Sequence, residues 1–87
     1  MRKLYVGILR SLFHRSLIRR RAELGLTQEE MAYRLEMACR TYIELDHGKS
    51  TCSALTLALY LIYVCADPVG FLEELRNAFD EANEKAA

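Results

Sequence analysis

The sequence contains little that interrupts a helix and little that builds a sheet. Its 87 residues include one proline and four glycines, and β-branched residues form few runs. This composition favours helices over strands. With 52% hydrophobic and 28% charged residues, the chain can bury a core and is not a disordered segment. Its length predicts one small domain in which every helix buries a face against the others.

The sequence also lacks net charge, since 12 Lys/Arg are balanced by 12 Asp/Glu. This balance excludes a uniformly basic, nucleic-acid-coating surface. The charges are unevenly distributed, because residues 1–49 hold ten basic and six acidic side chains, a balance of +4, and residues 50–87 hold two and six, a balance of −4. Either one end of the molecule is suited to phosphates, or the split reflects ordinary solvated helix faces.

Several site types are missing. Cys39, Cys52 and Cys65 are an odd number without a CxxC pair, which predicts neither a disulfide framework nor a zinc site and is typical of a reducing cytosol. No Ser/Cys–His–acid set, paired-carboxylate site or glycine-rich phosphate loop appears in the sequence. We therefore expect neither an enzyme nor a bound cofactor or metal.

Membrane targeting is weakly indicated at most. The start, MRKLYVGILRSLF, is interrupted by Arg10 and is followed by no small-residue cleavage site. The uncharged run 54–66, ALTLALYLIYVCA, is shorter than the roughly 20 residues of a membrane-spanning helix. We predict a soluble, cytoplasmic protein; the alternative is a basic amphipathic N-terminal helix lying on a membrane.

Apolar residues at helical spacing predict an all-α fold. Gly25 closes the first helix, and Thr27 with Glu30 forms a capping box for the second. Asp67 is expected to cap the last helix, with Pro68 as its first residue. The first helix is either continuous or broken near residues 11–16. The five expected helices span about residues 3–24, 28–36, 38–46, 53–66 and 68–79.

The stretch GLTQEEMAYRL, followed by TYIELDHGK, resembles the helix-turn-helix of the Cro/phage-repressor type, the XRE-like family of bacterial and phage regulators. The similarity covers about residues 17–75. It also includes Ala32 at the expected helix crossing, Gly48 after the second helix of the pair, and the closing segment DPVGFLEEL. The resemblance implies a five-helix domain over residues 17–79, preceded by a helical extension at 1–16 and followed by a frayed tail at 80–87.

In this family the first helix of the pair crosses the DNA backbone and the second enters the major groove. The resemblance therefore implies a sequence-specific DNA-binding transcriptional regulator, expected to be a repressor. It places Gln28 at a phosphate-anchoring helix N-terminus. The expected DNA-binding residues are Thr27, Gln28, Ala38, Cys39, Arg40, Thr41, Ile43, Glu44, His47 and Lys49.

Individual positions allow more than one role. Arg40 could fork to a guanine or bind a phosphate, and Glu44 could accept from cytosine N4 or pair with Arg40 across one turn. Ile43 could meet a thymine methyl or a protein. His47 and Lys49 are either backbone clamps or ordinary surface residues.

Two residues depart from the family pattern. Glu36 stands where glycine commonly permits a sharp turn, and Ala38 stands where a capping side chain is usual, at a cost of roughly 1 kcal/mol. These departures keep alternatives open. The main one is a helix-turn-helix used as a protein-interaction module, such as an antitoxin-like partner; a thiol switch at Cys39 is another.

The fourth expected helix is apolar all round and must therefore be covered on every side. One stripe, comprising Ala54, Leu57, Ala58, Leu61 and Cys65, is expected to face the core, with Tyr60 near the opposite side. Either the N-terminal segment or a second subunit covers the remainder. We predict a homodimer, with interface residues Tyr5, Ile8, Leu9, Leu55, Leu59, Ile62 and Tyr63.

Overall fold

The computed structural model describes residues 1–86, and within them every regular element is helical, which confirms the all-α prediction. None of the helices in this part of the chain is long and apolar enough to cross a membrane. The elements are α1 (Arg2–Leu24), α2 (Gln28–Arg34), α3 (Cys39–Asp46), α4 (Ala54–Leu59) with a π-helical turn (Tyr60–Val64) directly after it, and α5 (Pro68–Ala86).

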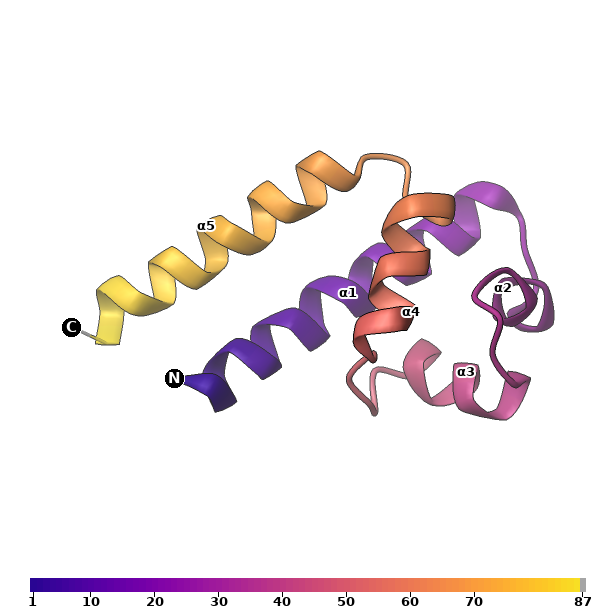
Figure 1. The fold of residues 1–87 in the computed structure, drawn as a ribbon, viewed down its shortest axis with the longest axis horizontal. Helices are drawn as coiled ribbons and strands as arrows, with labels where there is room; N and C mark the ends of the chain where they lie inside the picture. The colour runs from indigo at the N-terminus through magenta and orange to yellow at the C-terminus, as the bar shows by residue number, and fades with distance from the viewer. Residues whose placement is uncertain (87) are drawn as a thin grey trace.

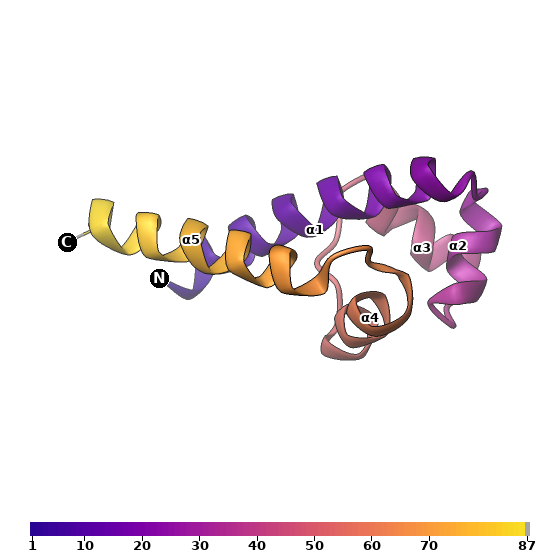
Figure 2. The same ribbon diagram turned by 90° about the horizontal axis from the view of Figure 1, so that it is seen from above.

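Helix α1 is the longest helix, and the other helices pack along it (Figure 1). Its C-terminal half carries α2, α3 and α4, and α5 runs back along its N-terminal half in the opposite direction, so both chain ends lie at the same end (Figures 1 and 2). The Tyr5 and Phe79 rings lie 4.5 Å apart between centroids, and the Tyr5 hydroxyl donates to Asn83 Oδ1 at 2.6 Å. Arg15 pairs with Glu74 at 3.1 Å. The acidic C-terminal helix thus lies along the basic N-terminal one.

Helix α1 is continuous rather than broken near residues 11–16, because its middle is buried in the core. Leu12, Phe13 and Ser16 are buried, as is Leu17. The expected domain boundary between residues 16 and 17 therefore falls inside one helix whose two sides share a core. At the other end, α5 continues past residue 79, where the sequence placed the start of a frayed tail.

Local capping signals were predicted correctly. Thr27 Oγ1 accepts from the Glu30 amide at 3.1 Å, and the Glu30 carboxylate accepts from the Thr27 amide at 3.0 Å. Asp67 Oδ1 accepts from the Gly70 amide at 2.9 Å. Gly25 and Gly48 both have left-handed backbone conformations, with φ of 66° and 72°.

The interior side of α4 and the π turn differs from the prediction. Thr56, Tyr60 and Val64 are buried at a spacing of four, whereas Ala54 and Ala58, expected to face inward, are exposed. Of the stripe expected to face inward, Leu57, Leu61 and Cys65 do pack against the core. A wide turn begins at Tyr60, in which the Cys65 amide donates to the Tyr60 carbonyl at 2.7 Å, five residues back. The Tyr60 ring, at the start of this turn, lies in the core. There it meets Phe13 edge-on, with centroids 5.2 Å apart.

Candidate functional site

Helices α2 and α3 pack against each other and are joined by residues 35–38. Their facing sides belong to the main core, through Met31 and Ala32 of α2, Leu35 directly after it, and Tyr42 and Leu45 of α3. The connection holds the two anomalies seen in the sequence. Glu36 has a φ of 54°, a left-handed conformation that L-residues adopt at a cost, and the Ala38 side chain gives α3 no capping hydrogen bond.

A buried carboxylate, Asp46, fixes α3 to both neighbouring helices. Its side chain is 6% exposed and accepts from Arg21 Nε of α1 at 3.1 Å and from Gln28 Nε2 of α2 at 2.9 Å. It also accepts from the Tyr42 hydroxyl on α3 at 2.9 Å. Helices α1, α2 and α3 therefore each contribute a hydrogen bond to one carboxylate, and these bonds orient α3 against α1 and α2.

This network shifts the ionisation of its members. Burial by itself would raise the pKa of Asp46, but the hydrogen bonds from Gln28 and Tyr42 and the Arg21 guanidinium outweigh it and hold that pKa below its ordinary value. Burial and the hydrogen bond to Asp46 raise the pKa of the Tyr42 phenol. The carboxylate is therefore charged and the phenol neutral throughout the physiological pH range.

The C-terminal end of α3 is braced by a second contact from α1. His14 Nε2 donates to the Asp46 carbonyl at 2.8 Å. The His14 ring also lies close to Gly48, where a Cβ atom would be 3.4 Å from it. His14 is thus half-buried and structural.

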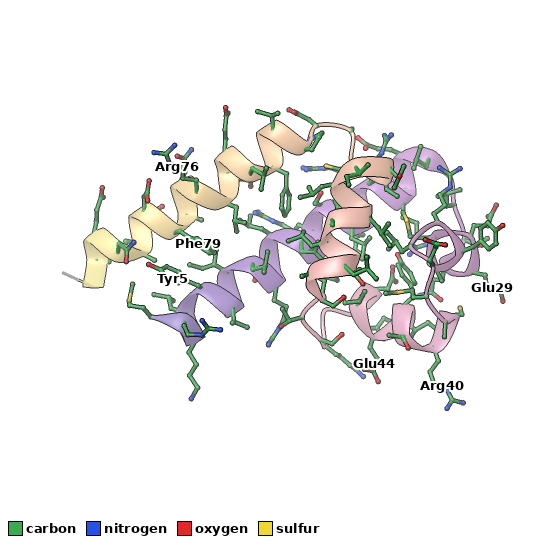
Figure 3. All side chains as sticks on the ribbon, in the orientation of Figure 1. Tyr5, Glu29, Arg40, Glu44, Arg76 and Phe79 are labelled. Atoms are coloured by element: carbon green, nitrogen blue, oxygen red, sulfur yellow. The ribbon has the colours of Figure 1, made fainter. Side chains whose placement is uncertain are left out.

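Fewer side chains are exposed on the outer surface of α3 than the sequence predicted. Arg40, Thr41, Glu44 and His47 are exposed, and Figure 3 shows Arg40 and Glu44 projecting away from the body of the molecule. Cys39 and Ile43 are only half-exposed, and Cys39 packs against the core. A switch that needs an open thiol at Cys39 therefore has little support.

Three of the other expected DNA-binding residues are exposed: Thr27, Ala38 and Lys49. Gln28 is half-buried, and its hydrogen bond to Asp46 leaves one of its two amide N–H groups for another acceptor. Sequence reasoning missed Arg10 of α1, whose Nε donates to Thr51 Oγ1 at 3.2 Å, two residues after Lys49 in the sequence. No local signal marks this residue, because 41 positions separate the two partners.

No family model, curated protein or solved structure matches this chain. Across residues 1–86, no group of three His, Cys, Asp or Glu side chains is placed to hold a metal ion. The geometry of the site therefore has to be interpreted from its own residues.

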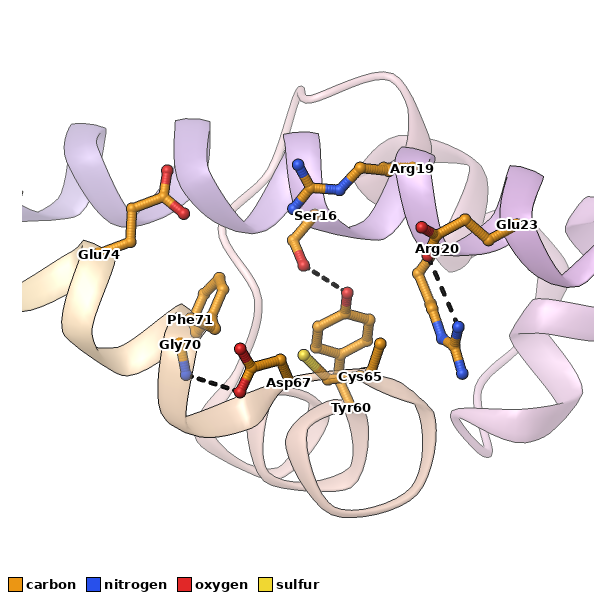
Figure 4. Close-up of a pocket in the computed structure, with 11 residues that line it drawn as sticks. Ser16, Arg19, Arg20, Glu23, Tyr60, Cys65, Asp67, Gly70, Phe71 and Glu74 are labelled. Carbon is orange, nitrogen blue, oxygen red and sulfur yellow. Dashed lines mark hydrogen bonds and ion pairs between the residues drawn. The ribbon is translucent and has the colours of Figure 1, made fainter.

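A cavity of about 500 Å³ lies between α1, the π turn and the start of α5 (Figure 4). Its volume would suit a small molecule. However, several of its polar side chains are already engaged: Arg20 donates to the Val64 carbonyl at 2.7 Å and pairs with Glu23 at 3.5 Å, and the Ser16 and Tyr60 hydroxyls bond each other at 2.5 Å. Among the described residues, no buried side-chain polar atom lacks a partner. Arg19 also lines the cavity, is exposed and makes no ion pair among the described residues, so the cavity offers a ligand an exposed cation but no buried polar group free to bind it.

The outer side of α4 and the π turn is an apolar surface that this chain leaves uncovered. Leu55, Ile62 and Tyr63 are 69%, 68% and 71% exposed, and we call these three residues the α4 patch. Leu59, expected to share this surface, is half-buried against the core. The N-terminal residues expected to flank it are half-buried within α1: Tyr5 packs on α5, Ile8 packs against the core, and Leu9 is intermediate in exposure.

Proposed function

We propose that this chain is a Cro/repressor-type helix-turn-helix protein that binds double-stranded DNA as a dimeric transcriptional repressor. One observation carries the proposal: the outer surface of α3 is open, while Arg21 and His14 of α1 hold α3 from its inner side. A helix presented in this way fits the major groove, where base edges can be read. The rigid attachment through Asp46 favours such a role, because base readout requires a fixed helix orientation.

In this proposal, the cations near α3, Lys49 and Arg10, contact DNA phosphates. Lys49 precedes Thr51 by two residues, Arg10 donates to Thr51, and both cations are exposed. If each subunit of a dimer used both, about four phosphates would be neutralised. The logarithm of the affinity should then fall against the logarithm of salt concentration with a slope of about −4.

The test is titration of the full chain against mixed genomic duplex fragments at several salt concentrations. Arg40→Ala should relax sequence preference, and Arg10→Ala should reduce the salt slope by about 2 per dimer. Arg76→Ala is the matched control, because Arg76 is an exposed arginine on α5 and faces away from α3 (Figure 3). Binding that is absent or insensitive to salt would contradict the proposal and favour the protein-interaction module.

The α4 patch supports the dimer. Three large apolar side chains on one helical face are typical of a surface that meets another protein. A two-fold pairing of copies through this face would bury it twice and would present two α3 helices to the two half-sites of an operator.

Sedimentation equilibrium tests the pairing. Ile62→Glu should convert a dimer to a monomer, because a carboxylate would have to be buried without a partner. Ile62 is a better probe than Leu59, since a change at half-buried Leu59 also perturbs the core. Tyr33→Glu is the control, because Tyr33 is an apolar side chain of α2 that is 83% exposed and lies outside the patch. An unchanged mass for Ile62→Glu would refute pairing through this face.

A further inference from the structure

The outer surface of α3 carries an exposed arginine and an exposed glutamate, an unusual combination for a helix that faces DNA. Arg40 and Glu44 are one helical turn apart and both exposed, yet among the described residues no ion pair joins them. Both side chains extend away from the body of the protein rather than toward each other (Figure 3). An exposed carboxylate repels phosphates, so its presence on this surface requires a compensating interaction.

Resting on the DNA-binding function proposed above, we infer that Arg40 and Glu44 together select duplexes in which a cytosine lies within one or two base-pair steps of a guanine. Arg40 reads the guanine, and Glu44 is the specificity-determining residue that reads the cytosine.

The spacing fits stacked base pairs. Four residues of an α-helix rise about 6 Å, and successive base pairs are about 3.4 Å apart. Two side chains separated by one turn therefore address base pairs one or two steps apart.

The chemistry of the two side chains assigns the bases. A guanidinium donates two parallel hydrogen bonds, which match the O6 and N7 acceptors of guanine. A carboxylate is an acceptor only, and the exocyclic N4 amino group of cytosine is the donor with which it pairs in the major groove. Opposite the acceptor atoms of guanine or thymine O4, the same carboxylate would be repelled. Glu44 therefore contributes specificity mainly by penalising wrong sequences.

The neighbouring positions leave this pair as the main readers of base edges. Ile43 is half-buried, and Cys39 packs against the core. Thr41 and His47 are exposed on the same helix and remain available for phosphates or a methyl group.

The experiment is selection of random duplexes by the full chain, followed by titration of the selected duplex. The parent protein should select guanine and cytosine at the stated spacing. Glu44→Gln should shift the cytosine position toward adenine, because an amide pairs with adenine N6 and N7, and Glu44→Ala should lose preference there by roughly tenfold. Glu84→Ala, which removes an exposed carboxylate of α5, should select the parental sequence.

A modified base gives an independent test. N4-methylcytosine keeps its pairing with guanine but places a methyl group where the groove-facing donor was. It should weaken binding of the parent roughly tenfold and leave Glu44→Ala unaffected, the coupling expected of a direct contact. If Glu44→Ala selects the same bases as the parent, the inference is refuted while the DNA-binding function stands. If the parent retains no duplex in a salt-dependent manner, the proposed function itself fails.

Discussion

Replacing Asp46 by asparagine tests whether this residue holds α3 in place. The change keeps the size of the side chain and removes its charge, so it creates no cavity. Three partners then lose a charged acceptor: Arg21, Gln28 and Tyr42. A hydrogen bond to a charged group contributes about 1 kcal/mol more than a neutral one, so the expected loss is about 3 kcal/mol. This loss is large beside the total stability of about 5–15 kcal/mol that is usual for a domain.

The free energy of unfolding is measured by denaturant titration, and the melting temperature by heating, both followed by circular dichroism at pH 7. A loss of about 3 kcal/mol corresponds to a fall in melting temperature of about 15 °C for a domain of this size. Asp80→Asn is the matched control, because Asp80 is exposed and its surface ion pair with Arg76 is long, at 3.9 Å. This change should alter stability by less than about 0.5 kcal/mol.

The pH dependence of stability gives a second, independent test of the Asp46 network. The pKa of Asp46 is lowered in the folded protein, so its contribution is present above the unfolded pKa of about 4 and is lost as pH falls below it. The stability gap between the parent and Asp46→Asn should therefore narrow below pH 4. A gap under about 1 kcal/mol at pH 7, or one that stays constant on acidification, would refute this account of the network.

Further predictions concern backbone strain and the core. Glu36→Gly should stabilise the fold by about 1 kcal/mol in thermal unfolding, because it relieves a left-handed conformation at φ 54°. Ala38→Ser should add about 1 kcal/mol by capping α3. Gly48→Ala should cost about 1–2 kcal/mol, since φ is 72°, a left-handed conformation that a residue with a Cβ adopts at a cost. Burial raises the pKa of Tyr60 to about 12, so unfolding free energy should fall between pH 10 and pH 12 in the parent, and less in Tyr60→Phe.

The features predicted correctly from the sequence are local. The capping box of Thr27 and Glu30, the left-handed glycines at 25 and 48, and the start of α5 at Asp67 each depend on residues within a few positions of one another. Their hydrogen bonds are determined by the backbone of one turn, and a single stretch of sequence contains all the partners.

The features that were missed depend on distant partners or on which face of a helix meets the core. Asp46 looked like the last residue of a helix, and its role depends on Arg21, which is 25 positions away. Tyr60 was assigned near the outer side because this helix is apolar all round, and periodicity alone does not select which of its faces meets the core. The surface of α3 was predicted more broadly than it is, because periodicity alone does not show which side chains at its margin, such as Ile43, are partly covered.

The π turn at Tyr60–Val64 uses one residue more than an ordinary turn of helix would. Deleting a single residue there would restore ordinary i-to-i−4 hydrogen bonding and leave the flanking helical turns at nearly the same relative rotation, because the wide turn already absorbs the extra residue. If the deleted residue were Ile62 or Tyr63, the α4 patch would lose one exposed side chain, while α3, which carries Arg40, would keep its position. Under the proposed pairing of copies, such a deletion would weaken the contact between them without changing the surface proposed to meet DNA.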